Sequence, residues 1–184
     1  MAVIVSLLRG INVGGNRKIK MDDLRALYES LGLHNPKTYI QSGNVVFQAG
    51  QKDLGKLALS LNASIERTYG FRADAVLRTL TDLKAMHTAN PFAARPVDPA
   101  KNLVIFLSGQ LTPEHAATVC GLCLAPEEIH SDGRHLHCHF PNGMGQSKLP
   151  MAIDKNLTKL NIIGTARNWN TVLKLIEIGE TLET

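Results

Sequence analysis

The sequence predicts an α+β protein made of two similar halves, each with the element order β-α-β-β-α-β, and a C-terminal helix. Three observations support this prediction. Short apolar runs of strand length alternate with segments whose apolar residues have helical spacing. The series of elements occurs twice along the chain, and the proline-rich segment 90–100 lies between the two copies. This element order is typical of a ferredoxin-like unit.

The first half is predicted to span residues 1–89. Residues 2–9 are almost continuously apolar, which is typical of a strand buried on both faces. A polar loop with a Gly-Gly pair then leads into a helical pattern, and Ser42-Gly43 between two β-rich runs indicates a hairpin. The predicted elements are a strand at 2–9, a helix from 22 to 31, strands at 37–41 and 44–48, a helix from 54 to 69 ended by Gly70, a strand at 73–78 and a short helix at 81–88.

The second half is predicted to span residues 101–184, after a linker at 90–100 that contains Pro91, Pro96 and Pro99. It repeats the element order of the first half but not its residues. The predicted elements are a strand at 103–107, a helix from 112 to 121, strands at 127–130 and 135–140, a helix beginning near Pro150, a strand at 162–166 and a final helix at 169–178.

The composition is that of a globular protein. Of the 184 residues, 44% are hydrophobic and 20% charged, and the net charge of +4 favours anionic ligands without choosing among nucleotides, nucleic acids and phosphorylated metabolites. The three cysteines argue against a disulfide framework and fit a reducing compartment. No apolar run approaches the ~20 residues of a membrane helix. We therefore expect a cytoplasmic protein that does not bind membranes.

Several segments together resemble one known family. They are LRGINVGG at 8–15, KIKM at 18–21, YIQSGNVVF at 39–47, LRT at 77–79, NPF at 90–92, SKL at 147–149 and TARNWNTV at 165–172. In this order, over nearly the whole chain, they are similar to the bacterial family known as domain of unknown function 1697. The resemblance implies a bacterial protein of about this length, and it implies no mechanism.

The loop from Arg9 to Lys20 is the first candidate for anion binding. Glycines allow the backbone to approach a ligand closely, and free N–H groups near a helix start attract anions. The loop has neither a G-x-G-x-x-G nor a Walker motif, so a solvated basic loop remains the alternative. The residues predicted to bind are Arg9, Asn12, Gly14, Gly15, Lys18 and Lys20.

Two further segments are candidates in the second half. The loop 142–148 joins a strand to a helix through glycines, and we predict that Ser147 and Lys148 contact a ligand. In the segment 165–170, Arg167 precedes a helix that Asn168 is placed to cap, which suits a carboxylate or phosphate clamp. The alternatives are a turn with a surface lysine, and an arginine that ties the last helix to the sheet.

The expected geometry separates some of these segments. Taking the first and third strands as parallel, we expect the loop 9–20 and the turn 41–44 to lie at opposite edges of the sheet. The loops after Leu107 and Phe140 are expected to share an edge. The default location for a ligand is then the cleft between the halves.

The cysteines and histidines form no recognisable metal motif. Cys120 and Cys123 make a C-x-x-C at the end of a helix, without the second pair that a zinc site needs. His135, His137 and His139 alternate along a strand, with Cys138 on the opposite face, and we interpret them as a solvated strand face. We therefore predict no metal site and no cofactor.

The sequence thus favours a protein that binds an anionic ligand, either a nucleotide, a nucleic acid or a phosphorylated metabolite. Two other classes remain open. One is an enzyme that acts on a phosphorylated or acylated small molecule through Ser147 or Lys148. The other is a protein-interaction module in which the same residues hold the fold together. Catalytic residues and oligomeric state are not predicted.

Overall fold

A computed structural model describes residues 1–183 and divides the chain into two compact units. The first unit comprises Met1–Met86 and the chain from Leu173 onward, and the second unit comprises His87–Val172. Both boundaries fall inside helices, namely α3 (Leu80–Thr88) and α6 (Trp169–Glu183).

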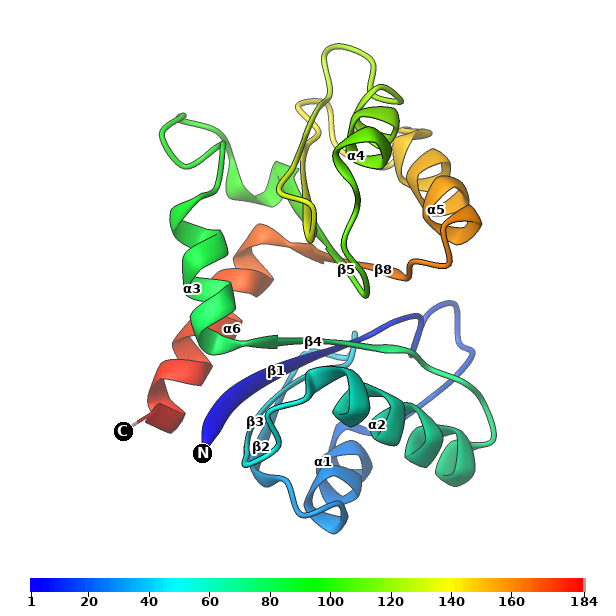
Figure 1. Ribbon diagram of the computed structural model, residues 1–184, viewed down its shortest axis with the longest axis vertical. Helices are drawn as coiled ribbons and strands as arrows, with labels where there is room; N and C mark the ends of the chain where they lie inside the picture. The colour runs from blue at the N-terminus through cyan, green and yellow to red at the C-terminus, as the bar shows by residue number, and fades with distance from the viewer. Residues whose placement is uncertain (184) are drawn as a thin grey trace. The chain divides into compact units, whose positions relative to one another are not determined.

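The first unit is a four-stranded antiparallel sheet with the strand order β2-β3-β1-β4. This is the order of a ferredoxin-like unit. Figure 1 shows α1 and α2 together on one face of this sheet. The elements in chain order are β1 (Ala2–Leu8), α1 (Met21–Ser30), β2 (His34–Tyr39), β3 (Asn44–Ala49), α2 (Leu54–Tyr69), β4 (Ala75–Thr79) and α3.

The core of the first unit lies between this sheet and the two helices. Its centre is formed by buried aliphatic and aromatic side chains, among them Ile4, Leu24, Phe47, Leu61 and Ile65. The Tyr28 ring packs edge-on against Phe47, and its hydroxyl donates a hydrogen bond of 2.8 Å to Ser6 Oγ. Burial raises the pKa of Tyr28 well above its usual range, so this hydroxyl stays protonated and satisfies the buried serine.

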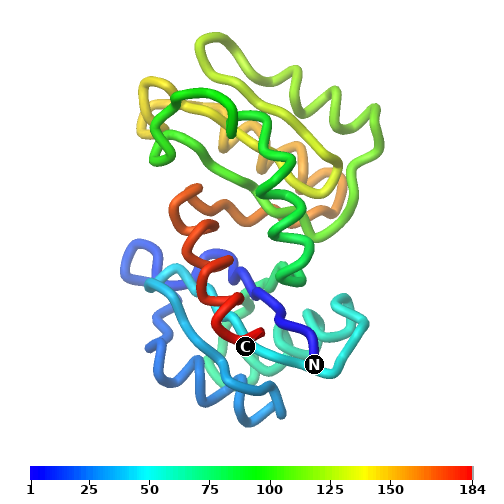
Figure 2. Tube along the Cα trace, turned by 90° about the vertical axis from the view of Figure 1, so that its left-hand side faces the viewer, coloured from blue at the N-terminus to red at the C-terminus, as the bar shows by residue number. Residues whose placement is uncertain are grey.

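The last part of α6 packs against the first unit. Gln48 Nε2 donates a hydrogen bond of 2.8 Å to the Leu182 carbonyl, which ties α6 to β3. Gly179 lies so close to α3 that a Cβ there would be 2.7 Å from Leu80 Cδ1. Figure 2 shows the end of α6 next to the start of β1. In agreement, Ala2 and Leu182 line the same surface pocket.

The second unit repeats the arrangement, with the strand order β6-β7-β5-β8 and antiparallel pairing throughout. In Figure 1, α4 and α5 lie on one face of this sheet. The elements are the short 3-10 helix η1 (Pro99–Lys101), β5 (Asn102–Leu107), α4 (Pro113–Cys120), β6 (Glu128–Ser131), β7 (His135–His139), α5 (Leu149–Lys159), β8 (Gly164–Asn168) and the start of α6.

The proline-rich segment 90–100 is attached to the second unit. The Phe92 ring is buried and lies 5.4 Å from the ring of His130 and 5.6 Å from that of His139. Arg95 makes a bidentate ion pair with Glu128, with N–O distances of 2.8 and 2.7 Å. The segment therefore covers part of the sheet face opposite α4 and α5.

The fold class predicted from the sequence is confirmed, but the predicted strand directions were wrong. β1 and β3 are antiparallel neighbours, and β1 is parallel instead to β2, on the far side of β3. The end of β1 therefore lies beside the start of β3, and the Leu8 amide donates a hydrogen bond of 2.9 Å to the Gly43 carbonyl. The loop 9–20 and the hairpin turn thus share one edge.

The same correction applies to the second sheet. Because β5 and β7 are antiparallel, Leu107 lies at the start of β7 and not at its end, where Phe140 follows. The loops after Leu107 and Phe140 are therefore at opposite edges. Within residues 1–183, no helix is long and apolar enough to cross a membrane.

Candidate functional site

The loop 9–20 is fastened to the hairpin turn by one side chain. Asn12 donates from Nδ2 to the carbonyl oxygens of Ile19 (3.0 Å) and Gln41 (2.8 Å). Its Oδ1 accepts a hydrogen bond of 2.9 Å from the Ile19 amide. Figure 2 shows the loop and the turn side by side. Asn12 was predicted to bind a ligand, but its amide is used to hold two loops together.

The backbone of this region is left-handed at several residues. Gly14 and Gly15 have φ of 59° and 79°, which glycine tolerates at a tip closed by a Val13–Asn16 bridge. Asn12, Arg17 and Ile40 also have positive φ, at 54°, 50° and 50°. For Ile40 this conformation is unfavourable because its Cβ is branched, and its side chain is 48% exposed. The loop and the turn are therefore under local strain.

A hollow of about 800 Å³ lies between this loop, the hairpin turn and the end of α2. Its lining combines lysines, carboxylates, amides and apolar surface. The lining residues are Asn12, Gly15, Lys18, Ile19, Lys20, Met21, Asp22, Asp23, Gln41 and Tyr69. Such a size is within the usual range of ~300–1,000 Å³ for small-molecule sites.

The positive charges of the hollow are not neutralised by its acidic residues. Within residues 1–183, Lys18 and Lys20 make no hydrogen bond or ion pair through their side chains. Asp22 pairs with Arg25, which lies outside the hollow. Lys18 and Lys20 are two positions apart, Lys20 has an extended backbone, and both side chains line the hollow.

The remaining carboxylate, Asp23, is close to the Tyr69 hydroxyl. Partial burial, and then the negative charge of Asp23, raise the pKa of Tyr69. Within the described part of the chain, the Asp23 side chain makes no hydrogen bond or ion pair. The hollow therefore has a cationic part at the lysines and an anionic part at Asp23.

Of the loop residues predicted from the sequence, Asn12, Gly15, Lys18 and Lys20 line this hollow, whereas Arg9 and Gly14 do not. The prediction missed Gln41 and Tyr69. Gln41 was excluded because the hairpin turn was expected at the other edge. Tyr69 ends α2, and no sequence pattern connects it to the loop.

The predicted residues of the second unit have mainly structural contacts. Ser147 Oγ accepts a hydrogen bond of 3.1 Å from the Leu149 amide at the start of α5. Lys148 is exposed, and both residues line a smaller hollow of about 300 Å³ beside Leu124 and Pro126. With φ −88° and ψ −9°, Lys148 has a helical backbone conformation directly before α5.

Arg167 and Asn168 form the junction between β8 and α6. Arg167 is 7% exposed, and its Nη1 donates to Thr165 Oγ1 (3.0 Å) and to the Ala166 carbonyl (2.8 Å). Burial lowers the pKa of Arg167 to about 10. Asn168 caps α6 by accepting a hydrogen bond of 2.9 Å from the Asn170 amide, and it donates to the Ala100 carbonyl. These Arg167 contacts stay within β8, whereas those of Asn168 connect the start of α6 to η1.

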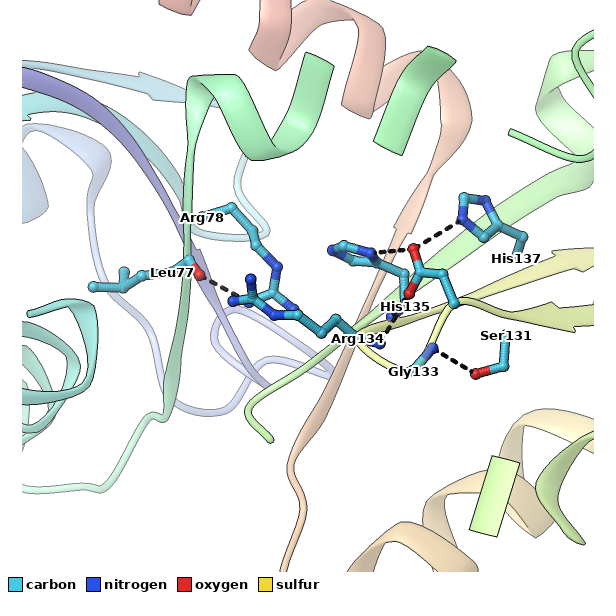
Figure 3. Close-up of polar contacts among 8 residues, drawn as sticks. Leu77, Arg78, Ser131, Gly133, Arg134, His135 and His137 are labelled. Atoms are coloured by element: carbon cyan, nitrogen blue, oxygen red, sulfur yellow. Dashed lines mark hydrogen bonds and ion pairs between the residues drawn. The ribbon is translucent and has the colours of Figure 1, made fainter. Parts of the chain in front are cut away.

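The histidines of β7 do not form a solvated face. His135, His137 and His139 are only 4–6% exposed. The Asp132 carboxylate accepts a hydrogen bond of 2.7 Å from the Nδ1–H group of His135, and it lies 3.9 Å from His137 Nε2 (Figure 3). Partial burial would raise the pKa of Asp132, but these histidines and the Arg134 amide outweigh it and hold that pKa well below its usual range.

The surroundings of the three cysteines disfavour their thiolate forms. Burial raises the pKa of the Cys138 thiol to about 12, and it also raises those of Cys120 and Cys123. Thiols become nucleophiles and metal ligands as thiolates, which these surroundings disfavour. No group of three or more potential metal ligands is found among residues 1–183.

Sheet order, helix placement and the two repeated units define this chain as a tandem ferredoxin-like α+β protein. The family model described as "Protein of unknown function (DUF1697)" matches residues 1–137, and the chain belongs to this family. A solved structure, that of the conserved bacterial protein SP0830 from Streptococcus pneumoniae, is similar over 98% of this chain and 99% of its own. The sequence identity is 27% and the TM-score 0.75. No curated protein matches the chain.

Proposed function

We propose that this chain binds an anionic small molecule in the hollow of its first unit. The observation that carries the proposal is the pair of lysines, Lys18 and Lys20. Both line a hollow of about 800 Å³, and neither ammonium group has an ion-pair partner within residues 1–183. Two cations that face the same space attract a ligand with a phosphate or carboxylate group.

The surroundings of the lysines support this proposal. Lys20 immediately precedes α1, and its side chain does not cap the helix within the described residues. The N–H groups of the first turn are therefore available near the two lysines, although Asp22 and Asp23 already supply negative charge there. Lysine and helix amides together are a common way to hold an oxyanion.

The shape of the site favours a small molecule over a nucleic acid. The lysines line a hollow whose walls are the loop, the hairpin turn and α2. Nucleic-acid binding relies on many phosphate contacts and weakens steeply with salt. A site with two lysines is expected to weaken only moderately as salt is added.

The enzyme alternative receives no specific support from the described residues. Ser147 Oγ accepts a hydrogen bond from the Leu149 amide, and within residues 1–183 no histidine or carboxylate side chain hydrogen-bonds to it. A serine nucleophile needs a base within hydrogen-bond reach. Ser147 is thus better explained as part of the turn that begins α5.

Isothermal titration calorimetry tests the proposal. The probes are inorganic pyrophosphate, ribose 5-phosphate and adenosine 5′-monophosphate, each at low and at physiological salt. We expect at least one probe to bind, and we expect the double variant Lys18→Ala/Lys20→Ala to weaken that binding about tenfold or more.

The matched control is Lys155→Ala/Lys159→Ala, which removes two exposed lysines of α5 that line none of the hollows described above. Its affinity should equal that of the unmodified protein. Equal losses in both double variants would mean that general charge, and not this hollow, attracts the anion. Absence of binding for all three probes would also overturn the proposal.

A further inference from the structure

The lining of the hollow is divided by chemistry, and this division restricts the ligand. Lys18 and Lys20 supply positive charge, whereas Asp23 supplies an unneutralised carboxylate in the same hollow. A ligand that carried only negative charge would gain at the lysines and be repelled at Asp23. A matching ligand therefore has an anionic end and, at a distance from it, an N–H donor.

The lining of the hollow is also partly apolar. Ile19 is 3% exposed and so lies beneath the surface of the hollow, and Met21 and the ring of Tyr69 also line it. Flat aromatic groups pack well on tyrosine rings and on the polarizable sulfur of methionine. A purely polar ligand, such as a sugar phosphate, would leave this surface without a partner.

Amide groups at the rim add hydrogen-bonding capacity. Gln41 lines the hollow and is exposed, and its backbone carbonyl oxygen accepts a hydrogen bond from Asn12. Its side-chain amide makes no hydrogen bond within residues 1–183 and so remains available to a ligand. A primary amide both donates and accepts, which is the pattern needed to read the edge of a base. An anion at one end, an aromatic body and an N–H donor at the other end describe a nucleotide.

We infer that the hollow binds a mononucleotide, with its phosphate at Lys18 and Lys20 and an N–H group of its base directed to Asp23. This inference rests on the proposed function and extends it by naming the ligand class. The aromatic base lies against the apolar lining next to Tyr69. The volume of about 800 Å³ accommodates a ligand of this size.

The decisive experiment compares three probes that share parts of one molecule. Adenosine 5′-monophosphate has both ends, ribose 5-phosphate has only the anion, and adenosine has only the base. Calorimetry on the unmodified protein should give an affinity for adenosine 5′-monophosphate about tenfold or more above that for ribose 5-phosphate, because only the nucleotide can make the base-edge contact and the stacking contact.

The variant Asp23→Asn tests whether the Asp23 carboxylate accepts a hydrogen bond from the base or only repels the phosphate. If Asp23 accepts a hydrogen bond from the base, the variant binds adenosine 5′-monophosphate more weakly but ribose 5-phosphate equally well or better, since a negative charge has been removed. The preference for the nucleotide should therefore fall several-fold, and the part that stacking on the apolar lining contributes should remain. If both probes bind more tightly to Asp23→Asn, the carboxylate only repels anions and the inference is wrong.

Two controls separate the failure of this inference from the failure of the proposed function. Glu114→Gln neutralises an exposed carboxylate at the start of α4 and should leave the preference unchanged. If ribose 5-phosphate and adenosine 5′-monophosphate bind equally and both depend on Lys18 and Lys20, anion binding stands and the nucleotide assignment falls. If no probe binds, both fall.

Discussion

The two units place different chemistry at equivalent edges of their two sheets. In both, the amide at the end of the first strand donates to the following hairpin turn: Leu8 to the Gly43 carbonyl at 2.9 Å and Leu107 to the Arg134 carbonyl at 3.0 Å. The connection that leaves this edge is long in the first unit, residues 9–20, and short in the second, residues 108–112. Loop length therefore sets what each edge becomes.

The long connection leaves a hollow with two lysines, whereas the short one packs directly on its hairpin turn. In the second unit the Leu111 amide donates to the Gly133 carbonyl at 2.8 Å, and the next residue before that glycine, Asp132, hydrogen-bonds to a buried histidine. The first edge keeps its charges available, and the second uses its charge to satisfy the core. One fold edge thus serves two purposes.

Another junction is the same in both units. Arg78 pairs with Val5, and Arg167 pairs with Val104, at equivalent places in the two sheets. Both arginines are buried and donate from Nη1 to the carbonyl of the preceding residue at 2.8 Å. The repeated contact supports a structural role for Arg167, because Arg78 makes it where no ligand was predicted. Figure 3 shows the contact at Arg78.

Substituting the glycine of each hairpin turn by alanine should give the largest difference in free energy of unfolding between the two units. In Gly43→Ala the new Cβ would be 2.6 Å from Ile11 Cδ1, at a φ of 78°. We expect the free energy of unfolding to fall by about 3 kcal/mol, from left-handed strain plus overpacking. Gly133→Ala has the same kind of φ, but its nearest atom is the flexible Gln110 side chain at 3.3 Å.

Gly133→Ala should therefore lower stability by only about 1 kcal/mol. Urea unfolding followed by circular dichroism gives both values. Equal losses in the two variants would contradict the tighter packing that we assign to the turn of the first unit.

Neutralising Asp132 in the second unit should lower the free energy of unfolding more than neutralising Asp23 in the first. Asp132 accepts hydrogen bonds from the amides of Arg134 (2.8 Å) and His135 (2.6 Å) as well as from the His135 ring. Asp132→Asn should lower the free energy of unfolding by about 2 kcal/mol, since hydrogen bonds to charged groups are worth ~1.5–3 kcal/mol each and this side chain is partly exposed. Asp23→Asn should change it by less than ~0.5 kcal/mol.

The contribution of Asp132 should also depend on pH. Its pKa is lowered in the folded state, so its carboxylate stabilises the protein above the unfolded-state pKa of ~4 and this contribution is lost as the pH falls further. Chemical unfolding at pH 7 and pH 3 should therefore show the difference between the unmodified protein and Asp132→Asn shrinking in acid. A constant difference would contradict the lowered pKa of Asp132.

Removing the Asn12 side chain should lower the free energy of unfolding less than Gly43→Ala or Asp132→Asn, but it should clearly increase the mobility of the loop 9–20. Asn12→Gly removes three hydrogen bonds while allowing the φ of 54°. We expect a loss of about 1 kcal/mol and faster hydrogen exchange at residues 13–19. The turn 131–134 of the second unit is the internal reference, and equal acceleration there would indicate global loosening instead of a released loop.

The smallest expected effect is an increase in stability, on replacing Ile40 in the hairpin turn of the first unit. Ile40 adopts a φ of 50° with a branched, half-exposed side chain, so Ile40→Gly should stabilise the protein by up to about 1 kcal/mol. Differential scanning calorimetry should show a slightly higher Tm, and Ile40→Val, which keeps the branched Cβ, should show none. A lower Tm for Ile40→Gly would mean that the side chain packs more than it strains.

Much of the fold follows from local patterns in the sequence. The apolar run of β1, the helical spacing of α1 and α2, and Gly70, which ends α2 at a φ of 75°, were all sufficient to place elements. Strand direction also follows from the element order, and the prediction misjudged it: reversal at each hairpin and helix makes β1 and β2 parallel to each other and antiparallel to β3 and β4. The order of the strands, with β1 between β3 and β4, comes only from the tertiary structure.

The candidate site was predicted only in part for the same reason. Lys18 and Lys20 stood out by charge and by their position before a helix. Gln41 and Tyr69 join them only through tertiary structure, because the turn and the end of α2 meet the loop in space. The burial of His137 also escaped prediction, since alternation along a strand does not tell whether a second layer covers its other face.

The contacts of α6 have a consequence for the order in which the chain becomes structured. Gln48 and Leu80 of the first unit are met by Leu182 and Gly179, which follow the entire second unit in sequence. A ribosome therefore releases all of β5 to β8 before the residues that complete the earlier sheet emerge. The unit made first is therefore completed last, and until then the nascent chain exposes apolar surface such as the Leu80 side chain, which chaperones can shield.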